Sequence, residues 1–227
     1  TYYHDSSLYK NAGSLTNMAV PATATSGWAW DNYLRRWAQR FDGSNDYVSV
    51  STLNTTTPQK IRTLAIWVKP TSALQTGVFG KCNGYAANLT NSLGWIAGWG
   101  IAWDASSNIH GIGADDSWNT LVVPISLAQW SHIVFLSDVS SCSLYHNGIL
   151  AATYATEVTD SGYLFTIGGA ANNGFKNYFP GTISDPLAWN RILSASEIRQ
   201  LADPSNVMLS GLILPPRRRL FAAGVAG

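Results

Sequence analysis

From residue 41 onward the chain consists of short strand-like runs, the first of which, in "FDGSNDYVSV", shows a strand-like alternation of Tyr, Val and Val. A period of two places every second side chain on one face of an extended backbone, which is typical of strands with one buried face. Gly, Asn and Pro separate the runs, and the helical period of about 3.6 is almost absent. The pattern predicts an all-β protein, built as an antiparallel β-sandwich or barrel. The predicted strands span residues 47–51, 64–69, 78–81, 95–103, 109–112, 130–136, 142–145, 149–154, 164–167 and 181–189.

Two short motifs predict local structure more sharply. Asn147-Gly148 lies between two strand-like runs, and Asn-Gly readily adopts the positive φ angles of a tight type I′ hairpin. Ser194-Ala195-Ser196-Glu197 has the Ser-x-x-Glu form of a capping box and precedes an apolar face. We therefore expect a hairpin at residue 147 and one short helix that starts after Ser194 and ends before Pro204.

The patterning divides the chain into three parts. Residues 1–40 read as an irregular N-terminal extension, in which Trp28, Trp30 and Trp37 provide apolar material for docking on the core or on a neighbour. Residues 41–203 form the strand-rich domain. Residues 204–227 contain a proline pair and three consecutive arginines, and we interpret them as a C-terminal arm that lies on the domain edge or docks on a partner.

Composition limits the classes of partner. Apolar residues make up 46% of the 227 residues, which is enough for a sizeable core. Charged residues make up only 12%, about half the usual share of roughly 25%. The formal net charge is +1, too small to attract nucleic acid or an anionic membrane. No apolar run approaches the length of a membrane-spanning helix. We expect neither nucleic acid nor membrane as a partner.

Six segments occur in the order seen in a known family: "FDGSNDYVSV", "TLAIWVKP", "WSHIVFL", "SLYHNGILAA", "LFTIGG" and "FPGTISDPLAWNRILSASEI". Over roughly residues 40 to 203 the chain resembles laminin-G-like jelly-roll domains of the concanavalin A-like lectin/glucanase superfamily. The resemblance implies two curved antiparallel sheets packed face to face, with a short helix after the last core strand. The flanking segments "SLYKNAGSLTNM" and "PPRRRLFAAGVAG" resemble the ends of such domains in bacteriophage and bacterial surface proteins.

The sequence argues against a catalytic site. Glycosidases of this superfamily resemble one another in a Glu-x-Asp-x-x-Glu strand that places carboxylates on one sheet face. This chain lacks the string, and its only glutamates are Glu157 and Glu197. Adjacent acids such as Asp115 and Asp116 would face opposite sides of a strand. We expect a non-catalytic protein, with a glycoside hydrolase or lyase as the less favoured alternative.

Calcium is the cofactor that the sequence favours most. Asp- and Asn-rich loops offer the oxygen ligands that this ion requires. The resemblance implies a structural ion between the first and last core strands, with ligands from Asp42, Asn45 and Asp185, although Pro186 stands where the family usually shows a second acid. The site requires Asp185 to lie close to Asp42. The alternative is a plain turn, in which the short acidic side chains of Asp42 and Asp46 accept hydrogen bonds from backbone amides.

Glycan binding is a frequent task of the family, performed by aromatic rings that stack on sugars and polar groups that bind hydroxyls. Trp95, Trp99 and Trp103 recur every four residues and so share one side of an extended strand. Neighbouring loops add further candidates near a rim: Asn88, Asp116, Trp118 and Asn119. The alternative is that the tryptophans fill the sandwich core.

These observations favour a non-catalytic structural and adhesion module, displayed as a surface or decoration component of a phage-like virion. Its expected partners are other virion or surface proteins, copies of itself and glycans. The alternative is a secreted or cell-surface carbohydrate-binding or adhesion domain of a larger bacterial protein.

Overall fold

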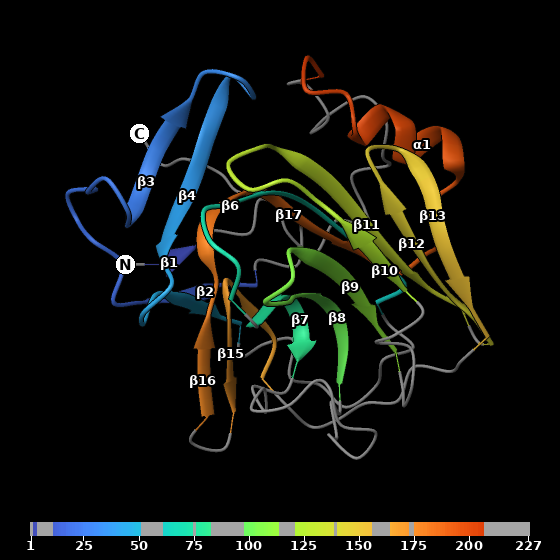
Figure 1. The fold of residues 1–227 in the computed structure, drawn as a ribbon, viewed down its shortest axis with the longest axis horizontal. Helices are drawn as coiled ribbons and strands as arrows, with labels where there is room; N and C mark the ends of the chain where they lie inside the picture. The colour runs from blue at the N-terminus through green and yellow to red at the C-terminus, as the bar shows by residue number, and fades with distance from the viewer. Residues whose placement is uncertain are drawn as a thin grey trace.

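The computed structural model describes residues 2–3, 11–50, 61–74, 76–82, 98–113, 121–138, 140–155, 164–172 and 175–206. These residues form two large antiparallel sheets, a two-stranded ribbon and one short helix (Figure 1). The first sheet has the strand order β1-β2-β5-β14-β7-β8-β9-β10. Its strands are β1 (Tyr2–Tyr3), β2 (Gly13–Thr16), β5 (Tyr47–Ser49), β14 (Thr166–Ile167), β7 (Thr76–Cys82), β8 (Gly98–Trp103), β9 (Asn108–Ile112) and β10 (Val122–Pro124).

The second sheet has the strand order β13-β12-β11-β6-β17-β4-β3. Its strands are β13 (Ile149–Tyr154), β12 (Cys142–His146), β11 (Ser131–Ser137), β6 (Thr63–Pro70), β17 (Pro180–Trp189), β4 (Arg36–Asp42) and β3 (Gly27–Asp31). β17 lies between β6 and β4, which are its partners on either side. β15 (Gly169–Asn172) and β16 (Phe175–Tyr178) form the separate ribbon.

The core lies between the two sheets. Alternate residues of β6, Leu64, Ile66 and Val68, point into it together with Ile101 and Trp103 of β8. All five are at most 1% exposed, so apolar burial between the sheets is the main source of stability. The predicted β-sandwich is confirmed.

The helix α1 (Ala195–Leu201) covers the outer face of the second sheet. Ile198 and Leu201 are buried there against Ala65, Leu187 and Trp189. Figure 1 shows α1 beside β12 and β13, at the opposite end of the sheet from β3 and β4.

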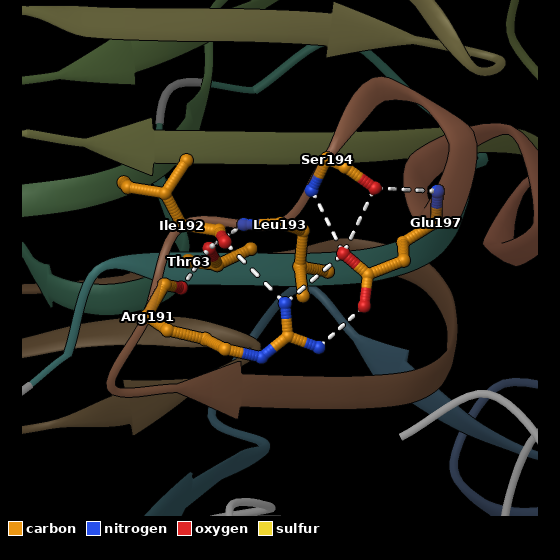
Figure 2. A network of polar contacts seen from close by, with 6 residues as sticks. All are labelled: Thr63, Arg191, Ile192, Leu193, Ser194 and Glu197. Carbon is orange, nitrogen blue, oxygen red and sulfur yellow. Dashed lines mark hydrogen bonds and ion pairs between the residues drawn. The ribbon is translucent and has the colours of Figure 1, made fainter. Parts of the chain in front are cut away.

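The helix begins as the capping motif predicts. The Ser194 hydroxyl accepts a hydrogen bond from the Glu197 amide at 3.3 Å, and the Glu197 carboxylate accepts one from the Ser194 amide at 2.8 Å. Figure 2 shows that the same carboxylate pairs with the Arg191 guanidinium, at 2.5 Å and 3.0 Å. Thr63 of β6 donates to the Arg191 carbonyl at 2.6 Å, which fixes the segment before the helix on the sheet. The hairpin at Asn147-Gly148 is also confirmed, with φ angles of 49° and 82°.

The segment before residue 41 differs from the irregular extension that the sequence predicts. β2 pairs with β5 in the first sheet, and β4 pairs with β17 in the second. The predicted boundary at residue 40 therefore lies within β4. Small and polar residues around these strands hide the alternation, and the partner strand β17 lies about 140 residues away in the sequence, so no local pattern reveals the pairing. The predicted arm is outside the described residues from position 207 onward.

Candidate functional site

The tryptophans predicted to bind glycans belong to the core wherever the structure describes them. Trp99 and Trp103 share one side of β8, as expected, but that side faces the other sheet. They are 3% and 0% exposed, and the indole of Trp103 donates to the Ser72 carbonyl at 3.1 Å. Neither ring offers a face to a sugar, so the alternative, the core assignment, holds for these two. The other candidates lie outside the described residues: Trp95, Asn88, Asp116, Trp118 and Asn119.

The predicted calcium ligands are not brought together. Asp42 pairs with Pro180, whereas Asp185 lies five residues further along β17. Five residues correspond to about 16 Å of extended chain. The Asp185 carboxylate forms an ion pair with the Arg36 guanidinium instead. No group of three or more His, Cys, Asp or Glu side chains suited to a metal ion occurs among the described residues. The set of Asp42, Asn45 and Asp185 therefore does not fit one calcium ion.

The stretch from Asp42 to Asp46 forms the turn that was the alternative to the metal site. Oδ1 of Asp42 accepts hydrogen bonds from the amides of Ser44, Asn45 and Asp46 at 2.8, 3.1 and 3.4 Å. Oδ2 of Asp46 accepts one from the Asp42 amide at 3.1 Å. Asp46 is fully buried, and this burial raises the pKa of its carboxyl above the ordinary value, against the hydrogen bonds from Ser26 and Asp42 that lower it. The two acids thus stabilise the entry into β5.

The exposed aromatic residues of the described part of the chain gather elsewhere, on the hairpin of β3 and β4 at the edge of the second sheet (Figure 1). Trp30, Tyr33 and Trp37 are 52%, 60% and 41% exposed. Trp30 and Trp37 are directly opposite each other across the two strands, and their rings meet edge to face with centroids 6.0 Å apart. Tyr33 lies in the turn between them. We call these three residues the hairpin aromatic surface.

The exposure of these rings follows from the faces to which successive side chains of β3 and β4 point and from their distance to the turn. Trp28 and Trp30 lie on the same face of β3, and Phe41 and Trp37 lie on the same face of β4. Trp28 and Phe41 pack on the core, whereas Trp30 and Trp37 lie nearer the turn, where the rings are exposed. The sequence signal is the regular spacing of "WAWDNYLRRWAQRF". Sequence alone predicted docking for these rings because it does not show where the facing sheet ends.

Buried polar contacts fix the shape of the hairpin. Oδ1 of Asp31 accepts hydrogen bonds from the amides of Tyr33 and Leu34, both at 3.0 Å, and Oδ2 accepts one from the Lys69 ammonium at 3.0 Å. Burial disfavours the ionised form of Asp31, but the bonds from Leu34 and Lys69 prevail and lower its pKa. The Lys69 ammonium also lies 4.9 Å from the centroid of the Trp130 ring, within the range of a cation–π contact. Hydrogen bonds and an ion pair within the domain therefore hold the turn in this conformation.

Arg36 anchors the turn end of the hairpin to the rest of the domain. Besides its ion pair with Asp185, its guanidinium donates to the carbonyls of Leu34 and Pro204 at 3.0 and 3.1 Å. It thereby joins β4, the bulge of β17 and the end of the segment after α1.

An Asp–His pair lies in the turn between β8 and β9. The Nε2 of His110 is 2.8 Å from Oδ2 of Asp104, and the same carboxylate accepts hydrogen bonds from the amides of Ser106 and Asn108. Burial raises the pKa of Asp104, but the hydrogen bonds from Asn108 and His110 outweigh it and leave the pKa low. These donors all belong to residues 106–110, so this carboxylate closes its own turn.

Within the described ranges, no helix is long and apolar enough to cross a membrane.

A laminin-G-type family model, described as the concanavalin A-like lectin/glucanases superfamily, matches residues 42–199. No curated protein matches the sequence.

Several solved structures share the fold. Domain 4 of AbnA, a GH43 extracellular arabinanase from Geobacillus stearothermophilus in complex with arabinotriose, has a TM-score of 0.53 at 17% identity; the match covers 89% of this chain and 98% of that one. Trypanosoma rangeli sialidase in complex with sialic acid has a TM-score of 0.55 at 16% identity. That match covers 85% of this chain and only 30% of the sialidase. The receptor binding domain of botulinum neurotoxin C/D mosaic serotype has a TM-score of 0.54 at 14% identity. That match covers 88% of this chain and 48% of the matched chain.

Proposed function

Because the chain belongs to the concanavalin A-like lectin/glucanases superfamily, we propose that it is a non-catalytic module that binds glycans through the hairpin aromatic surface. The observation that carries the proposal is the exposure of Trp30, Tyr33 and Trp37 on one hairpin whose turn is held by hydrogen bonds to Asp31. Aromatic rings combine a large apolar face with little loss of side-chain freedom, so they suit the C–H faces of sugars. The shared fold with an arabinanase domain in complex with arabinotriose adds support.

The non-catalytic part rests on the roles of four of the described carboxylates. Asp31, Asp42 and Asp104 accept backbone hydrogen bonds within turns, and Glu197 caps a helix. A glycosidase needs an acid and a second carboxylate facing the same bond of the sugar. These four groups lie in separate parts of the fold and serve local structure.

A glycan array with matched variants tests the proposal. Replacing Trp30 and Trp37 together by Ala removes the stacking rings, and we expect binding of the retained glycans to fall at least about ten-fold. The control replaces Ile149 and Leu150, which are 71% and 51% exposed on β13 at the opposite sheet edge, and should bind as the parent does. Melting temperatures within a few degrees of the parent would show that both variants fold.

Each outcome decides one part of the proposal. A parent protein that retains no glycan overturns glycan binding. Equal binding by both double variants overturns the assignment to the hairpin aromatic surface. Release of shorter sugars from a bound glycan overturns the non-catalytic assignment.

The setting that we propose is the surface of a phage-like virion, where the module attaches to other surface proteins or to copies of itself. This part rests on the resemblance of the flanking segments to phage proteins. A secreted or cell-surface adhesion domain is the alternative. Capsid and tail genes beside this gene would favour the virion, whereas genes for polysaccharide-degrading enzymes would favour the alternative.

A further inference from the structure

The charged residues beside the hairpin turn are Asp31, Arg35 and Arg36, and two of these three are paired within the fold. The Asp31 carboxylate is bound by two amides and by Lys69, and the Arg36 guanidinium is bound by Asp185 and two carbonyls. Arg35 is exposed and forms no hydrogen bond or ion pair with any described residue. The hairpin aromatic surface is therefore flanked by one uncompensated positive charge.

The backbone at Arg35 sharpens this observation. Its φ angle is 53°, in the left-handed region that Gly and Asn adopt more easily than arginine. A long cationic side chain at this position is not required by the turn.

Arg35 is close enough to the rings to contact the same ligand. Trp37 is two positions further along the chain, so the Cα atoms of the two residues are at most about 7 Å apart. Trp30 lies directly across from Trp37. A guanidinium is a planar fork of donors that matches the two oxygens of a carboxylate.

We infer that the hairpin aromatic surface binds an acidic saccharide, with its rings on the sugar face and the Arg35 guanidinium paired with a sugar carboxylate. This inference rests on the proposed function and names its ligand class. A neutral sugar would leave the guanidinium in water, whereas a uronate gains a charge-assisted hydrogen bond.

The test compares each acidic oligosaccharide with its own neutral form. Oligomers of galacturonate, glucuronate and mannuronate are presented next to the same oligomers after reduction of their carboxyl groups to alcohols. We expect the parent protein to prefer at least one acidic form about ten- to a hundred-fold over its reduced partner. Because the pair is exposed, the preference should fall as salt is raised.

Arg35→Asn is the informative variant, because Asn tolerates a positive φ and the fold should keep or gain thermal stability. It should bind acidic and reduced forms alike. Arg199→Gln, which removes an exposed arginine of α1, is the control and should keep the preference.

The two proposals fail separately. Equal binding of acidic and reduced forms by the parent, or an unchanged preference in Arg35→Asn, overturns this inference and leaves glycan binding by the rings in place. Failure of the parent to bind any glycan on the full array overturns both.

Discussion

The contact between Glu197 and Arg191 allows a prediction that joins charge to folding. The hydrogen bonds from Arg191, helped by those from Ser194, lower the pKa of Glu197 from 4.5 to about 2. Glu197→Gln keeps the size of the side chain and an oxygen that can cap the helix, but it removes the charge. The variant should therefore have a smaller unfolding free energy than the parent at every pH at which Glu197 is ionised in the parent.

The size of the effect follows from the pKa difference. At about 1.36 kcal/mol for each pH unit, a lowering of this extent corresponds to about 3 kcal/mol. The side chains of Glu197 and Arg191 are 21% and 23% exposed, so water screens part of the interaction. We expect a difference in unfolding free energy of about 1–2 kcal/mol between parent and variant.

The sign of the pH dependence is fixed. Because the folded pKa is lower than the unfolded one, the difference is fully present above pH 4.5 and is lost as the pH falls toward about 2. Urea unfolding followed by tryptophan fluorescence between pH 7 and 2.5 measures it. Asp203→Asn, an exposed acid just after the same helix, is the control and should show a smaller change. A difference that stays constant over this pH range would refute the argument, because it would then arise from cap geometry and not from charge.

Four further outcomes are expected. Arg36→Gln should lower the unfolding free energy by about 2–4 kcal/mol in urea, since it leaves the Asp185 carboxylate without the guanidinium; a loss below about 1 kcal/mol would contradict the anchoring role. Burial, with the charge of Arg36, lowers the pKa of His132 to about 3. The parent should therefore lose stability relative to His132→Phe as the pH falls from 6.5 toward 3, and a flat difference would count against this. Trp99→Ala should lower the unfolding free energy in urea by about 3–5 kcal/mol, and Trp30→Ala by less than about 1 kcal/mol. The reverse order would contradict the assignment of Trp99 to the core and of Trp30 to the surface. Chelation of divalent metals should leave the melting temperature unchanged, and a drop would reveal a calcium site other than the predicted one.

Local signals in the sequence predicted what depends on local physics. Asn147-Gly148 forms its turn and Ser194 starts its helix because the required backbone angles and hydrogen bonds involve neighbouring residues only. The short strand-like runs between turn residues likewise predicted β6 and β17. These elements would form the same way in many folds.

The candidate site depended on distances that a sequence does not contain. Trp99 and Trp30 both belong to alternating segments, and only the position of the facing sheet decides that the first is buried and the second exposed. Asp185 could be a ligand or an ion-pair partner, and the register of β17 against β4 decides the matter by separating it from Asp42. The pairing of β4 with β17, far along the chain, escaped prediction for the same reason.

The position of β17 has a consequence for how the protein is made. β4 and β6 are not paired with each other, and the strand that joins them ends only at Trp189. During synthesis, about 140 residues must follow β4 before its second partner strand exists, and until then both strands keep an open edge. Such long-range pairing slows folding and leaves the growing chain prone to aggregation. The second sheet can therefore close only late in translation, and a chain stopped before residue 180 should be insoluble although it already contains most of the strands.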